Sequence, residues 1–186
     1  MSLVLDLSGR VVLVTGGTKG IGLGITRSFL AAGATVVTCA RSASPTAEGA
    51  EHRVCDIRDP DAVVALVSGV VETHGRLDVL VNNAGGAPAS DAATASPRFH
   101  DKIVGLNLLS PLAVSQAANA VMQEQESGGS IVNISSISAH RAAPTVAAYG
   151  AAKAGLDSLT RSLAMEWAPR VRVNAVDVGL CRTENT

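Results

Sequence analysis

Aromatic side chains are almost absent from this chain of 186 residues, which contains two phenylalanines, one tyrosine and one tryptophan. A core without aromatic rings has to be built from valine, leucine, isoleucine and alanine, and hydrophobic residues make up 47% of the sequence. A chain of this length buries roughly two-thirds of its unfolded surface, so we expect one domain over residues 1–186. The single tyrosine, Tyr149, is not expected to be routine core filler.

An excess of charge of either sign is also lacking. The 15 lysines and arginines balance 16 acidic residues, giving a net charge of -1, and no block of like charges marks a nucleic-acid tail or a membrane patch. The start, MSLVLDLSGR, has Asp6 inside its apolar segment and no basic residue before it, unlike a signal peptide. No apolar run reaches the about 20 residues that cross a bilayer. We therefore expect neither a nucleic-acid nor a membrane partner.

Cysteine is scarce as well. Cys39, Cys55 and Cys181 are odd in number and widely spaced, and they lack the spacing of a metal site. This usage favours a reducing cytoplasm, and no metal site is predicted.

Short β-branched runs alternate with longer stretches rich in alanine and leucine. Near-continuous apolar runs, typical of strands covered on both faces, occur at 10–15, 35–39, 77–82, 130–135 and 171–176, with 51–56 as a weaker candidate. Helices are expected near 21–32, 59–74, 98–126 with a break at Pro111, and 146–168. This alternation predicts an α/β fold, a doubly wound parallel sheet in three layers with right-handed crossovers. Surface loops are expected at 43–50 and 84–97.

The segment TGGTKGIGLG, residues 15–24, follows the first strand and opens the first helix. Its glycines Gly16, Gly20 and Gly22 do not have the G-x-G-x-x-G spacing. They can still let the backbone approach a pyrophosphate, whose charge the helix N-terminus favours. An ordinary strand-to-helix loop is the alternative, but the position between a strand and a helix favours phosphate binding.

The residues after the second strand indicate the type of nucleotide. An acid there would bind the ribose 2′-hydroxyl of NAD, but the sequence has Ala40, Arg41 and Ser42. Arg41 offers a planar cation suited to a 2′-phosphate, and Lys19 can add a second positive charge. Either cation alone would more readily be a solvated surface residue. Together, with the acid missing, they favour NADP over NAD.

Three motifs now stand in order: TGGTKGIG at 15–22, NNAG at 82–85 and YGAAK at 149–153. From about residue 9 to the last residue, the chain resembles the short-chain dehydrogenase/reductase family, in the subgroup with T-G-x-x-x-G-x-G. The resemblance implies a Rossmann-like fold and hydride transfer between NADP(H) and a secondary alcohol or ketone. The cofactor-binding residues that it implies are Gly16, Thr18, Lys19, Gly20, Ile21, Gly22, Arg41, Asp56, Ile57, Asn83, Ala84, Gly85, Tyr149, Lys153, Gly179 and Thr183.

The resemblance also implies a catalytic set of Asn107, Ser136, Tyr149 and Lys153. Tyr149 would donate its phenolic proton to a ketone, or take the proton of an alcohol in reverse. A free tyrosine has a pKa near 10, so it needs a neighbouring positive charge, and Lys153 lies on the same helix face at i+4. Ser136 would hydrogen-bond the substrate oxygen, and Asn107 would hold a water in a proton relay. A lone asparagine in a helix is otherwise usually a surface residue or a local kink.

Two departures from the family keep an alternative open. Val178-Gly179 replaces the usual Pro-Gly, and the chain stops soon after Thr183, where family members continue through substrate-binding helices, a further helix and a seventh strand. We therefore expect that helix and strand to be absent. The alternative is a nucleotide-binding relative without catalysis, or a truncated inactive one.

The resemblance further implies self-association. Small residues along 146–168 let another helix approach closely, and the family pairs this helix across a two-fold axis. We therefore expect a homodimer or homotetramer.

Overall fold

The computed structural model of the chain describes residues 5–183, and its centre is a six-stranded sheet in the order β3-β2-β1-β4-β5-β6. Every neighbouring pair of strands is parallel. The strands are β1 (Val11–Thr15), β2 (Thr35–Ala40), β3 (Glu51–Val54), β4 (Val79–Asn82), β5 (Gly129–Ser136) and β6 (Val171–Val178). The helical elements are α1 (Gly20–Ala31), α2 (Pro60–His74), α3 (Pro97–Val104), η1 (Gly105–Leu109), α4 (Ser110–Glu124), η2 (Ile137–Ala139) and α5 (Ala147–Glu166). The predicted α/β class and parallel sheet are confirmed, and the weak candidate strand is β3.

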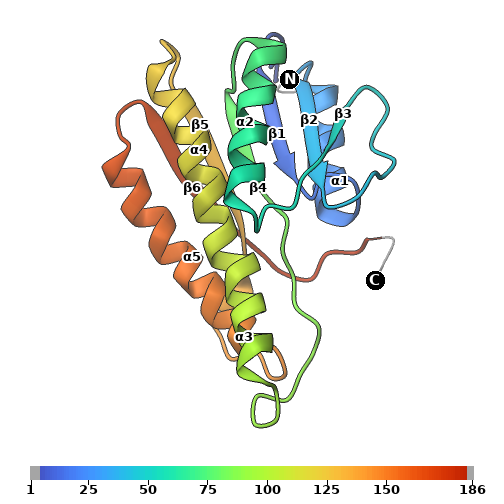
Figure 1. The fold of residues 1–186 in the computed structure, drawn as a ribbon, viewed down its shortest axis with the longest axis vertical. Helices are drawn as coiled ribbons and strands as arrows, with labels where there is room; N and C mark the ends of the chain where they lie inside the picture. Colours follow the sequence, from blue (N-terminus) through green and yellow to red (C-terminus); the bar gives the residue numbers. More distant parts are fainter. Residues whose placement is uncertain (1–4, 184–186) are drawn as a thin grey trace.

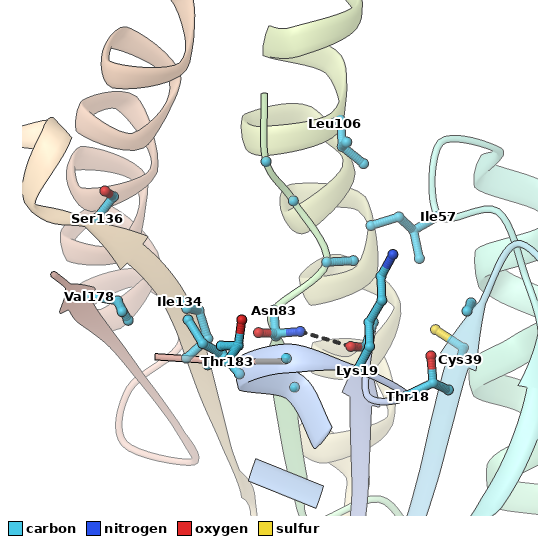
Figure 2. A pocket seen from close by; sticks show the side chains of 18 of the residues that line it. Thr18, Lys19, Cys39, Ile57, Asn83, Leu106, Ile134, Ser136, Val178 and Thr183 are labelled. Carbon is cyan, nitrogen blue, oxygen red and sulfur yellow. Dashed lines mark hydrogen bonds between the residues drawn. The ribbon is translucent and has the colours of Figure 1, made fainter. Parts of the chain in front are cut away.

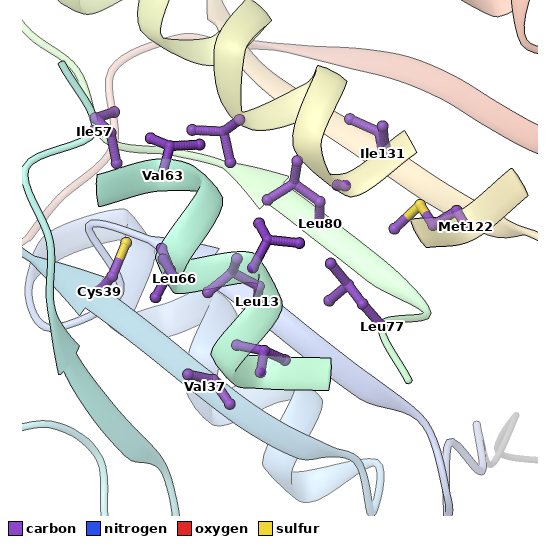
Figure 3. Packing of buried hydrophobic residues seen from close by; sticks show 14 of the residues in the cluster. Leu13, Val37, Cys39, Ile57, Val63, Leu66, Leu77, Leu80, Met122 and Ile131 are labelled. Carbon is purple, nitrogen blue, oxygen red and sulfur yellow. The ribbon is translucent and has the colours of Figure 1, made fainter. Parts of the chain in front are cut away.

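Helices α2, α4 and α5 cover one face of the sheet, and α1 lies on the other face (Figure 1). Between the sheet and the three helices lies the larger core, where Leu13, Leu80, Ile131 and Met122 are fully buried (Figure 3). Burying a side chain of this size contributes about 1.5–3 kcal/mol. The aliphatic core that the composition predicts is therefore the main source of the fold's stability.

The second face of the sheet is covered less completely. Helix α1 packs through Ile25 and Phe29 against Val12 and Val36, in the half of the sheet formed by β1, β2 and β4. At β6, buried and exposed residues alternate along the start of the strand, and Val176 on the later part is 50% exposed. The prediction that the run 171–176 is covered on both faces is therefore wrong for the described residues. The alternating polar positions in VRVN already carry the period of a half-buried strand.

The expected helix over 98–126 is one helical path with an irregular turn rather than a broken helix. It consists of α3, the π-helical turn η1 and α4, which form a continuous column in Figure 1. Pro111 is the second residue of α4, and because α4 continues directly from η1, its missing N–H and its ring disturb the turn before it. The expected break at Pro111 is therefore present as an irregular π-helical turn directly before it, and the helical path itself continues.

No helix within residues 5–183 is long and apolar enough to cross a membrane.

A buried carboxylate, Asp78, binds two partly exposed arginines at the end of the sheet where β1 and β4 begin. The carboxylate of Asp78 accepts hydrogen bonds from the Arg10 guanidinium at 2.8 Å, from Nε of Arg76 at 2.7 Å and from the Val11 backbone N–H at 2.9 Å. Burial alone would raise the pKa of Asp78, but the hydrogen bonds from Arg76, Val11 and Arg10 outweigh burial and hold the pKa below its usual value. The ionised carboxylate therefore stabilises the fold.

We predict that Asp78→Asn lowers the free energy of unfolding by about 1–3 kcal/mol at neutral pH, because two cations lose their charged acceptor. Both arginines are partly exposed, so water limits the loss. A carboxylate with a lowered folded pKa stabilises above its ordinary pKa of about 3.9, and the contribution disappears as the pH falls through the folded pKa. Urea unfolding at several pH values measures it, with the exposed Asp101→Asn on α3 as control. Equal losses in the two variants would contradict the prediction.

Candidate active site

A cavity of about 650 Å³ lies at the carboxyl ends of the parallel strands. Its walls come from the turn between β1 and α1, from the segments that follow β2, β3, β4 and β6, from the end of β5, and from two side chains of α5. This is the edge at which open parallel sheets bind ligands. The predicted cofactor-binding residues all line it, as does Ser136: Gly16, Thr18, Lys19, Gly20, Ile21, Gly22, Arg41, Asp56, Ile57, Asn83, Ala84, Gly85, Tyr149, Lys153, Gly179 and Thr183.

The glycine turn fits a phosphate group. Gly16 and Gly20 have φ of 64° and 54°, a region that L side chains rarely adopt. A Cβ on Gly22 would collide with the carbonyl oxygen of Gly16 and the side-chain amide of Asn83. Within this described turn, Lys19 makes no side-chain cap at the N-terminus of α1, and the first turn of the helix has no acidic residue. An anion can therefore use the positive end of this helix.

Thr15 and Asn83 hold the glycine turn against the end of β4. The Thr15 hydroxyl oxygen accepts hydrogen bonds from the backbone N–H groups of Asn83 and Ala84, both at 3.0 Å. The side-chain amide of Asn83 donates in return to the carbonyl oxygens of Thr15 at 3.0 Å and Gly16 at 3.1 Å. Figure 2 shows Asn83 between Lys19 on one side and Ile134 on the other. Thr15 was not predicted as a site residue, although it opens the first motif.

One end of the cavity carries cations and hydroxyl groups. Arg41 and Lys19 are exposed there, and Ser42 and Ser44 line the wall beside them. Asp56 is the acidic residue among the lining residues that the structure describes, and the Arg58 guanidinium donates hydrogen bonds to both of its carboxylate oxygens. The hydrogen bond from Arg58 is the main reason that the pKa of Asp56 falls to about 2, and the charge of Arg41 adds to it. Arg58 was not predicted as a site residue, although its position two residues after Asp56 is compatible with an ion pair between them.

Ser136, Tyr149 and Lys153 line the other part of the cavity. The Lys153 ammonium is buried, donates a hydrogen bond to the carbonyl oxygen of Ile134 at 2.6 Å and lies 5.7 Å from the centre of the Tyr149 ring. Burial lowers the pKa of Lys153 to about 8, against the opposing charge of Asp157. At pH 7 the ammonium is therefore still largely protonated. The structure thus brings the predicted serine, tyrosine and lysine to one cavity.

Asn107, by contrast, does not line the cavity. It is fully buried in the π-helical turn, where its side-chain oxygen accepts from the Gly86 N–H at 2.8 Å. Its amide donates to the carbonyl oxygens of Gly86 at 3.0 Å and Ile103 at 2.9 Å. A Cβ on Gly85 would lie 2.7 Å from the same Asn107 oxygen. Asn107 therefore anchors the segment after β4, and its role in a water relay stays a prediction.

Several lining residues were not predicted. Most of them lie next to predicted residues at strand ends, and Leu106 lies next to Asn107, which is the sequence feature that could have identified them. They are Cys39, Cys55, Gly86, Leu106, Ile134, Ser135, Val178, Leu180 and Cys181.

Comparison with known proteins gives dehydrogenases as relatives of this chain. The family model described as short chain dehydrogenase matches residues 10–186. The 3alpha-hydroxysteroid dehydrogenase of Mediterraneibacter gnavus is 34% identical, over 96% of this chain and 76% of that protein. The 2-dehydro-3-deoxy-D-gluconate 5-dehydrogenase of Escherichia coli is 34% identical, over 97% of this chain and 75% of that protein.

Solved structures agree with the sequence relatives. The aldohexose dehydrogenase of Thermoplasma acidophilum superposes with a TM-score of 0.92 at 32% identity, over 98% of this chain and 71% of that one. A short chain dehydrogenase of Mycobacterium smegmatis gives a TM-score of 0.87 at 34% identity, over 97% of this chain and 80% of that one. With the family model matched along nearly its whole length, the chain belongs to the short-chain dehydrogenase family.

Proposed function

We propose that this protein transfers a hydride between NADP(H) and a secondary alcohol or ketone. The observation that supports this best is that one cavity is lined both by a glycine turn suited to phosphate and by Ser136, Tyr149 and Lys153. The relatives named above are dehydrogenases, which supports an oxidoreductase acting on CH–OH groups. Their names specify chemically different substrates, so the proposal names only the reacting group.

The nucleotide would be held along the strand ends. The glycine turn would bind its pyrophosphate, since the turn combines a close backbone approach with a helix N-terminus whose first turn carries no acidic residue. Gly179 and Thr183 line the part of the cavity toward the nicotinamide in this proposal. When bound, a nicotinamide cofactor supplies the hydride chemistry that amino-acid side chains lack.

The preference for NADP rests on the charge at the adenosine end. Arg41 and Lys19 are solvent-exposed cations on the cavity wall, and serine hydroxyls beside them can donate to phosphate oxygens. Asp56 is already paired with Arg58, so it is poorly placed to accept a bond from a ribose hydroxyl. A 2′-phosphate would find cations there, and among the described lining residues a 2′-hydroxyl would find no unpaired acid.

The catalytic proposal assigns one task to each side chain. Ser136 accepts a hydrogen bond from the Ser138 backbone N–H at 3.2 Å, which uses a lone pair and leaves the hydroxyl hydrogen able to bind a substrate oxygen. Tyr149 would pass its phenolic proton to that oxygen during reduction. The buried ammonium of Lys153 stabilises the negative charge left on the phenolic oxygen, more strongly than it would in water.

We also propose that the protein is a homodimer or homotetramer paired through α5. Ala147, Ala151 and Ala154 are exposed on this helix, and Met165 near its end is 84% exposed. Small exposed side chains let a second helix approach closely.

We predict that Tyr149→Phe lowers kcat by roughly 10²–10⁴-fold, because it deletes a proton donor while keeping the ring. The Kd for NADPH should not change. Turnover of a panel of sugars, sugar acids, hydroxysteroids and simple ketones gives kcat, and NADPH fluorescence gives the Kd.

Ser136→Ala should lose turnover as well, whereas Ser138→Ala keeps the backbone N–H that Ser136 accepts from and serves as its control. A Tyr149→Phe variant with most of the wild-type kcat would rule out the proton-donor role. Wild-type protein that binds NADPH tightly but turns over none of the panel would favour the alternative of a nucleotide-binding relative without catalysis.

For cofactor choice, Arg41→Asp should weaken NADPH binding by roughly 10–100-fold, since a charge-assisted hydrogen bond is worth about 1.5–3 kcal/mol. NADH binding should improve, because the new carboxylate can accept from the 2′-hydroxyl. Fluorescence titration of both nucleotides measures the change, and Arg98→Asp on α3 controls for charge reversal. Wild-type protein that binds NADH as tightly as NADPH would show that the assignment to NADP is wrong.

Two glycines of the same helix give a matched test of the phosphate turn. Gly22→Ala should lower NADPH affinity by at least tenfold, because its Cβ must displace the Gly16 carbonyl or Asn83. Gly24→Ala meets open space and should leave affinity unchanged while raising stability by about 0.4–1 kcal/mol. Nucleotide titration and thermal unfolding of the two variants decide it. Equal affinity in both would mean that the turn does not contact the nucleotide.

A further inference from the structure

A second cluster of polar side chains lies outside the residues that line the nucleotide cavity. It consists of His140, Asp157 and Asp177, which come from three different elements. His140 follows η2 directly, Asp157 is on α5, and Asp177 is on β6, where it stands opposite Ser135 in the sheet register. The proposed hydride transfer uses none of the three.

The ligand atoms of the cluster converge. Nε2 of His140 lies 3.0 Å from a carboxylate oxygen of Asp177 and 3.2 Å from a carboxylate oxygen of Asp157. One atom from each residue lies within 4.8 Å of the other two. Two ligands of a tetrahedral ion, each about 2.0–2.1 Å from it, are roughly 3.3 Å apart. Small side-chain movements would therefore bring these three atoms around one ion.

Within this cluster, Asp157 is the buried residue whose carboxylate has no hydrogen-bond partner among the described residues. Its side chain is only 7% exposed, and neither carboxylate oxygen has a hydrogen-bond partner within residues 5–183. The 3.2 Å approach to His140 is an ion-pair distance without hydrogen-bond geometry, because the imidazole hydrogen bonds to Asp177 instead. The ammonium of Lys153, one turn earlier on α5, hydrogen-bonds to Ile134 rather than to this carboxylate. A buried carboxylate without partners is costly, and a cation can remove that cost.

We propose that His140, Asp157 and Asp177 bind a divalent first-row transition metal ion of the Zn²⁺ type. An imidazole with two carboxylates suits such an ion better than Mg²⁺ or Ca²⁺, which prefer oxygen ligands alone. The His140 side chain is 59% exposed and that of Asp177 37% exposed, so an ion can enter and water can complete its coordination. On binding, the ion takes the Nε2 lone pair, and the imidazole keeps one hydrogen on Nδ1. Any proton on Nε2 goes to solvent.

The metal would fasten three elements that meet near Ser136. His140 is four residues after that serine, Asp177 is on the strand beside β5, and Asp157 is one turn from Lys153. A bound ion would hold the start of the loop after η2 against α5 and β6. It would therefore raise the free energy of unfolding, by an amount that grows with the logarithm of its affinity.

The test is a Zn²⁺ titration of protein without a histidine tag, in a Cys181→Ser background that removes the exposed thiol. Isothermal titration calorimetry and elemental analysis after dialysis measure affinity and stoichiometry, and thermal unfolding with and without a chelator gives an independent readout. We expect one Zn²⁺ per chain, a higher Tm with Zn²⁺, and much weaker binding of Mg²⁺.

His140→Ala and Asp177→Asn should each lower the Zn²⁺ affinity at least tenfold. Changing a residue that only hydrogen-bonds to a metal ligand already costs roughly 10–100-fold in affinity, so loss of a ligand should cost no less. His74→Ala is the matched control, since His74 also pairs with a carboxylate, Glu51, at 3.0 Å but belongs to no such three-residue cluster within residues 5–183. Asp157→Asn tests the buried third ligand in the same way, provided that circular dichroism shows that the variant is folded.

Binding that His140→Ala removes and His74→Ala preserves would support the site. Wild-type protein that binds no Zn²⁺, or binds it equally in His140→Ala, would overturn the proposal, and the cluster would then be only a hydrogen-bonded contact between elements.

Discussion

The parallel pairing of β1 with β4 is the constraint on which the site depends. Because the two strands run in the same direction in register, the turn after Thr15 and the segment after Asn82 leave the sheet side by side. The Thr15 hydroxyl and the Asn83 side chain then hydrogen-bond across this junction. The glycine turn, the cavity floor and the entry to α1 are all positioned by this one strand pair.

Lys153 connects the sheet to the proposed catalytic tyrosine. Its ammonium is buried between the end of β5, where it bonds to the Ile134 carbonyl, and the Tyr149 ring one turn earlier on α5. Burial makes the charge less favourable, whereas the carboxylate of Asp157 favours it. Lys153, which would stabilise the phenolic oxygen, is thus itself held by the Ile134 carbonyl and by the charge of Asp157. Because Asp157 also belongs to the cluster with His140 and Asp177, a change of charge in that cluster would affect the active site.

Local pattern was enough to predict the fold class, and the motifs that carry the family resemblance were enough to predict many of the residues that line the cavity. Apolar runs and glycine spacing are encoded within a few consecutive residues, so the strands and the turn of Gly16 to Gly22 could be predicted. Asn107 could not be placed, because its burial depends on the π-helical turn, which no spacing in GLNLL indicates. The convergence of His140 with Asp157 and Asp177 was also hidden, since it needs three elements that are separated in sequence to be packed together.

The π-helical turn has a consequence for how this chain can change. The hydrogen bonds of this turn run from residue i to i+5, so it takes up one extra residue while the helices on either side keep their direction. Losing one residue from η1 would therefore leave an ordinary α-helical turn between α3 and α4. The wide turn that brings Asn107 to Gly86 would be gone, and the backbone beside the cavity would lose its support. The length of this turn is therefore constrained together with the identity of Asn107, and insertions or deletions are tolerated less well here than in the surface loops.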